Sequence, residues 1–528
     1  MQPPLFNPGG NSEDCLYLNI YAPLNASSST LLPVLVWIHG GGFFLGGKDQ
    51  YNLTRFASTG AVVGVSINYR LGPFGFLRVD EESPGVNGFL DQVQALKWIR
   101  ANIANFGGDP DKVTIAGESA GGSSVLLHLI SPASNGLFHQ AYASSPWSSI
   151  APTMIDANVT SATFAMVANC SSDDLRSCIQ NATAEFIMEK YGAYQQLCSS
   201  QGIPYYAYHD EQLFLFCSSS YPVVGNAVLP GQIKDFLNKT ANKVSSVMIG
   251  ATWNDALWLP GGFGGKSLQL STPDLYKSNQ INRTQGNYIH VLNQVVDRKP
   301  YDEDADSYTR LYSSRAQAIY EMYPYEINED FTDMYPYGYN GYQPDGSLDA
   351  TYVYMALAQD KYWLCPPMSA MSIMLKNSPP SSVYMFRFKQ PLQVFQSEYA
   401  KLGNDPVRAV EKLFYSLNLY PSHAFDMPFF SLTETFEYPL ILTATPVNFT
   451  ADEEKLNLRM FSAFVDFLHT GDPNLGPMNA SVGTTWEKYD PDKRNMIYLS
   501  EPEVSVHSAE NVRASQCKFW EEDMNFEF

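Results

Sequence analysis

One serine, flanked by glycines and placed between an apolar strand and an apolar helix, limits the possible folds of this chain more than any other feature. Residues 113–116 predict a short buried strand, and residues 120–129 predict a helix. Between them, Gly117-Glu118-Ser119-Ala120-Gly121 has the G-x-S-x-G spacing of a sharp turn that exposes a nucleophilic serine. The N–H groups at the helix start would point toward that serine. The motif alone is a weak signal, but this context favours a nucleophile over a glycine-rich loop.

Alternating strand and helix patterns predict an α/β protein with a mostly parallel sheet flanked by helices. Apolar, β-branched runs predict further strands at residues 34–39, 61–67, 246–251, 383–388 and 496–499. Apolar residues at three- and four-residue steps predict helices at residues 89–103 and 453–468. Residues 260–350, rich in Tyr, Asp and Gly, are expected to form a helical or irregular excursion. Because no internal repeat or low-complexity linker interrupts the chain, residues 1–528 are expected to form a single domain.

A second glycine run follows the strand at residues 34–39. In His39-Gly40-Gly41-Gly42-Phe43, three glycines let successive backbone N–H groups turn toward one point. Together with the N–H of Ala120, they are expected to form an oxyanion hole, in which each donor stabilises developing charge by roughly 3–4 kcal/mol. His39 itself is expected to be structural, because it precedes the serine in chain order.

The general base is expected among the histidines that follow the serine, since the order oxyanion loop, nucleophile, acid, base is that of α/β-hydrolases. His423 is favoured because it lies in a loop between apolar segments, from which an imidazole can reach the sheet edge. His469, at a helix end, and His507, in a polar segment, have the sequence context of surface residues. His290 falls within the irregular excursion.

Asp255 is the predicted acid of the triad. It follows the apolar strand at residues 246–251, so its carboxylate is expected at the carboxyl edge of the sheet, and it lies between Ser119 and His423 in the chain. Asp426 is the rival acid. Because Asp426 follows His423 by only three residues, a local structural role is expected for it.

The charge balance argues against several classes of partner. The chain has 33 Lys and Arg against 54 Asp and Glu, a net charge of −21, so nucleic acid and anionic membrane surfaces would be repelled. No apolar run reaches the roughly 18 residues of a membrane span, and the C-terminus carries no anchor signal. No stable membrane anchor is expected. None of the seven cysteines has zinc-type CxxC spacing, and neither a metal nor a cofactor is predicted.

Nine N-x-Ser/Thr sequons predict an exported glycoprotein; they begin at Asn25, Asn52, Asn158, Asn169, Asn181, Asn238, Asn282, Asn448 and Asn479. The cysteines agree, because Cys170 and Cys178, or Cys198 and Cys217, are close enough for short disulfide loops. Met1 is followed by Gln2-Pro3-Pro4 rather than by a charged and then apolar leader. The chain is therefore expected to be truncated at its start and to lack its signal peptide.

Five segments, in order, resemble the type-B carboxylesterase, cholinesterase and lipase family over nearly the whole chain. They are Glu13-Asp14-Cys15-Leu16-Tyr17-Leu18-Asn19, the glycine run after His39, Asn68-Tyr69-Arg70-Leu71-Gly72, Phe106-Gly107-Gly108-Asp109-Pro110 and Gly117-Glu118-Ser119-Ala120-Gly121-Gly122. The resemblance implies an α/β-hydrolase fold, with its N-terminal part missing here. It also implies Gly41, Gly42 and Ala120 as oxyanion donors and His423 as base.

The resemblance implies further contacts. Cys170–Cys178 and Cys365–Cys517 resemble the family's second and third disulfides, whereas Cys198–Cys217 rests on spacing alone, and Cys15 is expected to be unpaired because its family partner would precede Met1. Arg70 with Asp109, and Asp360 with Arg513, resemble buried ion pairs of the family. Trp147 and Trp258 are placed like residues lining its acyl pocket. At the acid the family usually has Glu, so Asp255 shortens the reach to His423 by one methylene.

Hydrolysis of carboxylic esters through an acyl-enzyme is the activity that these features predict, with a small-molecule or lipid ester as substrate. The stretch before Glu13 lacks the tryptophan by which cholinesterases bind a quaternary ammonium, so choline esters are not expected. Glu118 would add negative charge beside the nucleophile or serve as a buried hydrogen-bonding residue, and no catalytic role is assigned to it. The alternatives are a lipase for longer acyl chains and, less favoured, a non-catalytic adhesion or binding protein of the same fold.

Overall fold

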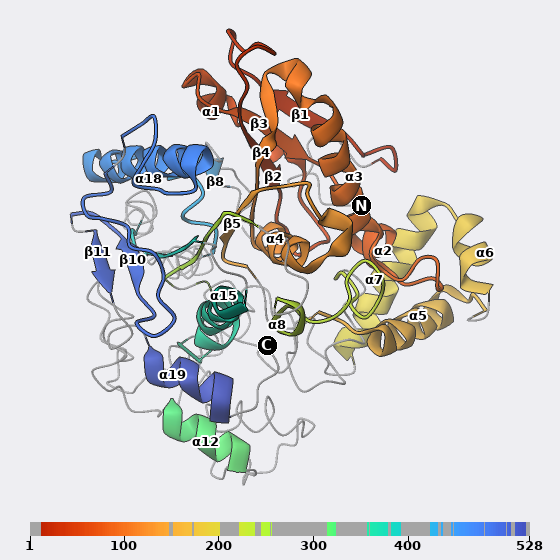
Figure 1. Ribbon diagram of the computed structural model, residues 1–528. Coiled ribbons are helices and arrows are strands. Elements are labelled where there is room, and N and C mark those ends of the chain that lie inside the picture. Colours follow the sequence, from red (N-terminus) through yellow and green to blue (C-terminus); the bar gives the residue numbers. More distant parts are fainter. Residues whose placement is uncertain are drawn as a thin grey trace, which may run out of the picture.

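The computed structural model describes residues 12–146, 151–171, 174–200, 221–237, 244–253, 255, 314–323, 356–357, 359–377, 382–391, 423–430, 435–436, 445–446, 448–479, 481–502, 504–507 and 513–523. Its central feature is a nine-stranded sheet with the order β1-β3-β2-β4-β5-β6-β7-β10-β11 (Figure 1). The strands are β1 (Leu18–Tyr21), β2 (Leu32–Ile38), β3 (Val63–Ile67), β4 (Gly108–Glu118), β5 (Gln140–Ser144), β6 (Ser246–Thr252), β7 (Ser382–Phe388), β10 (Met496–Leu499) and β11 (Ser505–His507).

Every neighbouring pair from β3 to β10 is parallel, and only the two edge strands, β1 and β11, run antiparallel to their neighbours. A separate short ribbon pairs β8 (Thr435–Phe436) with β9 (Thr445–Pro446). Parallel strands need crossover connections, which helices provide here. The predicted α/β-hydrolase class, a mostly parallel sheet flanked by helices, is confirmed.

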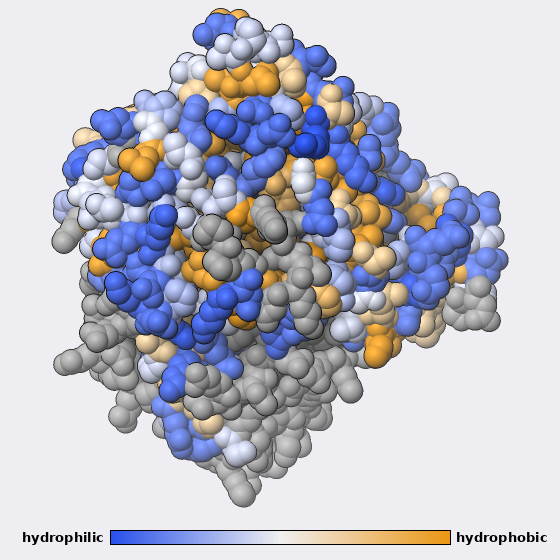
Figure 2. Space-filling model, in the orientation of Figure 1, coloured by the Kyte–Doolittle hydropathy of each residue, from blue (hydrophilic) through white to orange (hydrophobic). Residues whose placement is uncertain are grey.

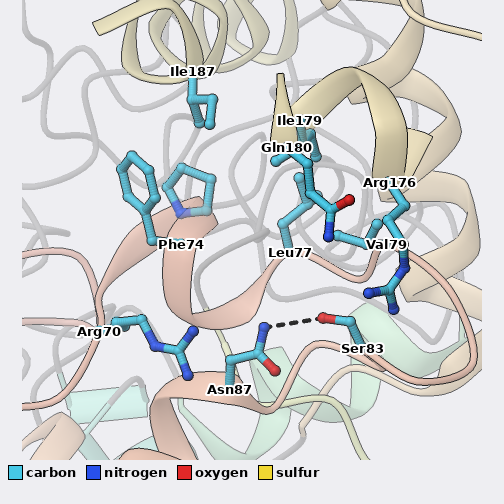
Figure 3. Close-up of a pocket in the computed structure, with 11 residues that line it drawn as sticks. Arg70, Phe74, Leu77, Val79, Ser83, Asn87, Arg176, Ile179, Gln180 and Ile187 are labelled. Atoms are coloured by element: carbon cyan, nitrogen blue, oxygen red, sulfur yellow. Dashed lines mark hydrogen bonds between the residues drawn. The ribbon is translucent and has the colours of Figure 1, made fainter. Parts of the chain in front are cut away.

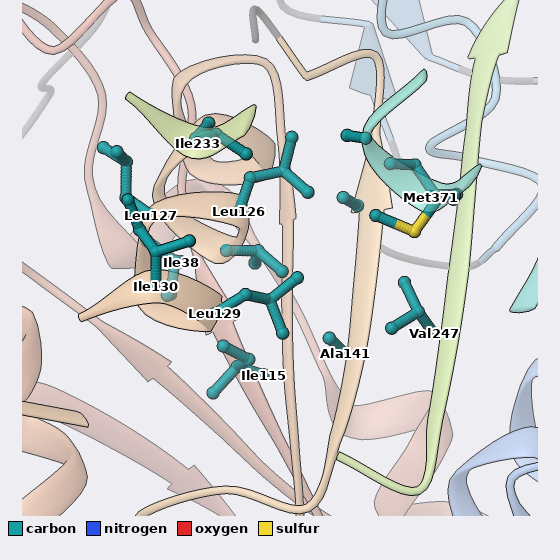
Figure 4. Packing of buried hydrophobic residues seen from close by; sticks show 14 of the residues in the cluster. Ile38, Ile115, Leu126, Leu127, Leu129, Ile130, Ala141, Ile233, Val247 and Met371 are labelled. Carbon is teal, nitrogen blue, oxygen red and sulfur yellow. The ribbon is translucent and has the colours of Figure 1, made fainter. Parts of the chain in front are cut away.

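Side chains alternate between the two faces of each strand and so build two cores. On β2, Val34, Val36 and Ile38 pack into one hydrophobic cluster, while Leu35 and Trp37 pack into another. Figure 4 shows the first cluster, where Leu129 of α4 (Ala120–Ile130) lies near Ile115 of β4. Continuous apolar strands are the expected sequence of a sheet that is covered on both faces.

Different helices cover the two faces (Figure 1). The first core also takes side chains from α3 (Asn87–Asn102), α8 (Ile233–Phe236) and α15 (Cys365–Asn377), and the second from α1 (Thr54–Ser58) and α18 (Ala451–Thr470). A smaller cluster joins α5 (Met154–Ala168), α6 (Leu175–Gln180) and α7 (Ala184–Ser200). The remaining helical elements are η1 (Lys48–Gln50), α2 (Gly72–Phe76), η2 (Ile103–Phe106), η3 (Pro132–Ser134), α12 (Ser314–Met322), η9 (Asp360–Leu364), α19 (Ala514–Lys518) and η12 (Phe519–Asp523).

Two of the predicted disulfides are present. Cys170–Cys178 ties the end of α5 to α6, and Cys365–Cys517 ties α15 to α19. Cys15 forms no disulfide within the described part of the chain. The predicted Cys198–Cys217 bond lies outside the residues whose side chains are described.

One of the two predicted ion pairs is wrong. The Arg70 guanidinium donates to Asp91, from Nε at 2.7 Å and from Nη2 at 2.8 Å, and not to Asp109. Arg70 follows the carboxyl end of β3, whereas Asp109 lies at the amino end of the parallel strand β4, so the two residues are at opposite edges of the sheet. Asp91, in the first turns of α3, is the carboxylate within reach.

The second ion pair, Asp360 with Arg513, is confirmed and is buried. Arg513 Nη2 lies 2.5 Å from Asp360 Oδ2, with side-chain exposures of 7% and 0%. The same carboxylate accepts a hydrogen bond from the Tyr323 hydroxyl at 2.9 Å, and Trp520 Nε1 donates to that hydroxyl at 2.7 Å. Through these contacts Asp360 of η9 is joined to Tyr323 at the end of α12 and to Arg513 at the start of α19, and Trp520 of η12 is joined to Tyr323.

Arg513→Ala is expected to lower the free energy of unfolding by about 3–5 kcal/mol, because it leaves the buried Asp360 carboxylate without its cation. The matched control is Arg100→Ala, whose pair with Asp111 has side-chain exposures of 44% and 73%. That change is expected to cost under about 1 kcal/mol. Urea or thermal unfolding of both variants measures the difference, and equal stabilities would contradict a special contribution from the buried pair.

Hydrophilic residues cover much of the described surface in Figure 2, with apolar residues scattered among them. None of the helices in the described ranges is long and apolar enough to cross a bilayer.

Candidate active site

The loops after β2 and β4 meet at the carboxyl edge of the sheet. The two strands are neighbours, with Ile38 opposite Gly117, yet the chain passes through β3 on the far side of β2 before it returns to form β4. Such a change in strand order leaves a crevice at the carboxyl ends, where α/β proteins bind their ligands. The predicted oxyanion loop and the predicted nucleophile therefore lie side by side.

Ser119 occupies the strained turn that its motif predicts. Its backbone angles are φ 56° and ψ −122°, between the end of β4 and the first residue of α4. The flanking glycines are required for space: a Cβ at Gly121 would lie 2.0 Å from the Ile38 carbonyl oxygen, and one at Gly117 would lie 2.4 Å from the Gly121 carbonyl carbon. Strain of this kind persists only where the surrounding structure fixes it, and it is typical of functional sites.

His423 and Asp255, which are 168 residues apart in the chain, are joined by a hydrogen bond. His423 Nδ1 lies 2.8 Å from Asp255 Oδ1, and the backbone N–H of Thr252 donates to Asp255 Oδ2 at 3.0 Å. Asp255 is fully buried and His423 is 8% exposed. With its proton on Nδ1, the imidazole would have an unprotonated Nε2, as a general base requires.

The glycine loop lies against the nucleophile. A Cβ at Gly40 would come within 3.1 Å of Ser119 Cβ, and Gly41 and Gly42 have φ values of 106° and 59°. Within the described part of the chain, no hydrogen bond uses the N–H of Gly41, Gly42 or Ala120. Ala120 is buried and the two glycines are partly exposed, so the three donors are available to solvent or to an oxygen of a bound ligand.

Glu118 lies closer to the base than the sequence indicated. Its Oε1 is 3.1 Å from His423 Nε2, and the carboxylate is buried. Burial raises the pKa of Glu118, with Asp426 and Asp255 adding to the rise and His423 opposing it. Burial would lower the pKa of His423, but the charges of Glu118 and Asp255 and the hydrogen bond to Asp255 raise it.

These two shifts are coupled, since the charge on each group alters the other's proton affinity. A proton held by Glu118 removes the negative charge that raises the pKa of His423. While Glu118 is ionised, its charge holds the pKa of His423 above the usual value of an imidazole, and neutralising or removing this carboxylate lowers that pKa.

Glu118→Gln is expected to move the acid limb of the kcat/KM–pH profile down by about one to three pH units, because it removes a negative charge that raises the pKa of His423. A lower imidazole pKa leaves the base neutral, and therefore active, at lower pH. The profile for p-nitrophenyl acetate between pH 5 and 10 measures the shift. Glu82→Gln, at a side chain that is 87% exposed, is the control and should leave the profile in place. An unmoved acid limb in Glu118→Gln would show that this carboxylate does not act on His423.

The rival acid, Asp426, contacts a different partner. Its Oδ2 accepts a hydrogen bond from Ser144 Oγ at 2.5 Å. Burial raises the pKa of Asp426 to about 6, against the lowering effect of that bond. In this arrangement Asp255, and not Asp426, contacts the imidazole. Sequence reasoning did not identify Ser144 as a partner, because no local pattern connects residues 144 and 426.

The other described histidines that the sequence offered as candidates have different partners. His39 is buried, stacks on Tyr69 and has Nδ1 2.8 Å from the Gly40 carbonyl oxygen, in keeping with the structural role predicted for it. His469 Nε2 lies 2.7 Å from the Ala61 carbonyl oxygen, and the ring is half-buried rather than on the surface as predicted. His507 stacks on Tyr498 at the sheet edge. His290 lies outside the described residues.

The two predicted pocket tryptophans, Trp147 and Trp258, also lie outside the described residues. A tryptophan that the sequence did not single out, Trp363 in η9, approaches His423 edge to face, with ring centroids 6.3 Å apart. η9 is a π-helical turn, a feature often found at functional sites.

A separate cavity of about 280 Å³ lies between α2, α6 and α7 (Figure 3). Apolar side chains such as Phe74 and Ile187 line it, with Arg70 and Arg176 among its polar residues. None of the predicted catalytic residues lines this cavity.

Comparison with known proteins identifies the family of the chain. The model of the carboxylesterase family matches residues 2–520. The chain is 46% identical over 186 residues to pyrethroid hydrolase Ces2e of Rattus norvegicus, covering 34% of this chain and 32% of that protein. It is 55% identical over 131 residues to cocaine esterase of Oryctolagus cuniculus, a match that covers 25% of each chain. It is 40% identical over 255 residues to liver carboxylesterase 1F of Rattus norvegicus, a match that covers 47% of this chain and 44% of the relative. These matches cover between 25% and 44% of the length of the relatives. The chain belongs to the carboxylesterase family.

Proposed function

We propose that this protein hydrolyses carboxylic esters through an acyl-enzyme, with Ser119 as nucleophile, His423 as general base and Asp255 as the acid that orients it. The observation that carries the proposal is the 2.8 Å contact between His423 Nδ1 and Asp255 Oδ1, at the sheet edge where Ser119 occupies its strained turn. A hydrogen-bonded acid–base pair and a serine on a strained turn are two of the features that a serine hydrolase uses, and they support the proposal.

In the first half-reaction, Ser119 Oγ adds to the ester carbonyl carbon and gives its proton to His423 Nε2. The Asp255 carboxylate stabilises the imidazolium that forms. His423 then passes the proton to the departing alcohol oxygen, which leaves the acyl group on Ser119. In the second half, water gives a proton to His423 and adds to the acyl carbon, and Ser119 Oγ leaves and takes the proton back. The net change is ester and water to acid and alcohol.

The oxyanion of each tetrahedral intermediate would accept hydrogen bonds from the N–H groups of Gly41, Gly42 and Ala120. The positive φ angles of the two glycines and the position of Ala120 as the first residue of α4 support these roles. The helix N-terminus adds a partial positive charge near the same point. Each donor would stabilise the transition state by roughly 3–4 kcal/mol.

The substrate is proposed to be a small or medium-sized carboxylic ester; of the proteins that match parts of this chain, one is named a pyrethroid hydrolase and one a cocaine esterase. Trp147 and Trp258 remain proposed pocket residues.

The strands of the sheet come from residues 18–507, which supports one domain over residues 1–528. Export and N-glycosylation are proposed from the two disulfides and from the sequons: the seven sequon asparagines within the described ranges are all exposed, namely Asn25, Asn52, Asn158, Asn169, Asn181, Asn448 and Asn479.

Labelling with a fluorophosphonate probe, followed by peptide mapping, tests the proposed nucleophile. One equivalent of label on the peptide that contains Ser119 is expected, together with release of p-nitrophenol from p-nitrophenyl acetate. Absence of both label and turnover would favour a non-catalytic binding protein of this fold.

Hydrolysis rates across p-nitrophenyl esters of increasing acyl length test the substrate class. Rates that fall beyond short and medium chains are expected for an esterase. Rates that rise toward long chains would instead support a lipase.

A further inference from the structure

Ser144, the last residue of β5, is in contact with both the nucleophile and the loop that carries the base. Its carbonyl oxygen accepts a hydrogen bond from the Ser119 N–H at 3.0 Å. Its hydroxyl donates to Asp426 Oδ2 at 2.5 Å, and both side chains are fully buried. One residue therefore joins the turn of Ser119 to the turn that begins at His423.

The turn after His423 is held firmly on its apolar side. Phe425, Phe429 and Phe430 are fully buried in the second core. The N–H groups of Phe429 and Phe430 donate to the Asp426 carbonyl oxygen at 3.0 and 3.2 Å. Asp426 is only three residues from His423 in this compact turn, so its side-chain bond to Ser144 ties the turn to the end of β5.

The next residue, Ser145, connects the same point to the acid. Its φ is 43°, a left-handed conformation that is disfavoured for a serine. Its N–H donates to the Gly250 carbonyl oxygen of β6 at 2.7 Å. Its hydroxyl accepts a 3.4 Å hydrogen bond from the Thr252 N–H, which also donates to Asp255. The end of β5 thus adjoins the supports of all three proposed catalytic residues.

We propose that the Ser144–Asp426 hydrogen bond is a positioning contact for catalysis, which sets the place of the His423 imidazole relative to Ser119. This inference rests on the proposed esterase function. Neither residue touches the substrate in this role. The proton moves from Ser119 to His423 only within hydrogen-bond reach, and a displacement of about 1 Å lowers the rate of such steps by about 100-fold.

Ser144→Ala removes the donor. Its kcat for p-nitrophenyl acetate, per active site titrated with the fluorophosphonate, is expected to fall by about 10- to 100-fold with KM unchanged. The control is Ser66→Ala, because Ser66 is a fully buried serine of β3 whose hydroxyl has no hydrogen-bond partner in the described part of the chain. That variant should keep the wild-type kcat. A Ser144→Ala enzyme with wild-type kcat per site, whatever its melting temperature, would overturn the proposal.

Asp426→Asn separates positioning from direct catalysis, because asparagine keeps an oxygen that can accept the Ser144 bond. It is expected to lose less kcat than Ser144→Ala, and the double variant is expected to lose no more than Ser144→Ala alone, since both changes act on one contact. A loss of about 10⁴-fold in Asp426→Asn, the size seen when a triad acid is neutralised, would instead make Asp426 the acid and overturn the proposal. If the wild-type chain itself neither hydrolyses esters nor takes the label, the esterase function has failed. That outcome is recognised before any variant is compared.

Discussion

Ser119→Ala is expected to lower kcat for p-nitrophenyl acetate by about 10⁶-fold while the melting temperature stays near that of the wild type. The substitution removes the oxygen that forms the acyl-enzyme. It keeps the backbone bonds of the turn, from the Ser119 N–H to the Ser144 carbonyl oxygen at 3.0 Å and from the Ser123 N–H to the Ser119 carbonyl oxygen at 2.8 Å. Any hydrolysis that remains faster than the uncatalysed reaction in water would come from the oxyanion donors and from substrate binding.

Loss of the fluorophosphonate label in the same variant makes this test specific, because the probe reacts with the activated serine and not with the fold. Ser66→Ala again serves as the control and should be labelled fully. If Ser119→Ala kept more than about 1% of kcat, far above the remainder expected without a nucleophile, another residue would be forming the acyl-enzyme.

The central strands could be predicted because both faces of the sheet are buried. The runs at residues 34–39 and 246–251 are almost wholly apolar and appear as β2 and β6. β5, with the sequence Gln-Ala-Tyr-Ala-Ser, was not predicted, because it has no β-branched residue and depends on its two neighbours for stability. The edge strands β1 and β11 are short and only partly buried, so their local signal is weak as well.

Candidates for the catalytic residues could be chosen from the sequence, because each follows a predicted strand or lies in a loop and because their order in the chain is that of α/β-hydrolases. What sequence could not supply are the contacts between distant segments. The bond from Ser144 to Asp426 spans 282 residues, and the contact of Glu118 with His423 depends on how the base loop folds over the turn of Ser119. The predicted pair of Arg70 with Asp109 rests on the family resemblance alone, and the direction of the parallel strands excludes it, because Asp109 lies at the amino end of β4 and Arg70 follows the carboxyl end of β3.

Asp255→Asn is expected to lower kcat by about 10⁴-fold, the loss that this change causes in serine proteases. The reason lies in the two contacts of the carboxylate. Oδ2 accepts the Thr252 N–H at 3.0 Å, so an asparagine would place its oxygen there and turn its NH₂ group toward His423 Nδ1. Nδ1 would then have to accept a hydrogen bond, and the imidazole proton would move to Nε2. With a proton already on Nε2, His423 could not take one from Ser119.

A change of tautomer can be distinguished from a loss of structure by KM and by the melting temperature. KM should change little and melting should stay near wild type, because the amide keeps both contacts. Asp466→Asn is the matched control: Asp466 is a fully buried aspartate of α18 whose carboxylate accepts the Met478 N–H at 2.7 Å, a bond that asparagine can also accept. That variant should retain kcat per titrated site. A near-wild-type kcat in Asp255→Asn, together with a large loss in Asp426→Asn, would transfer the role of triad acid to Asp426.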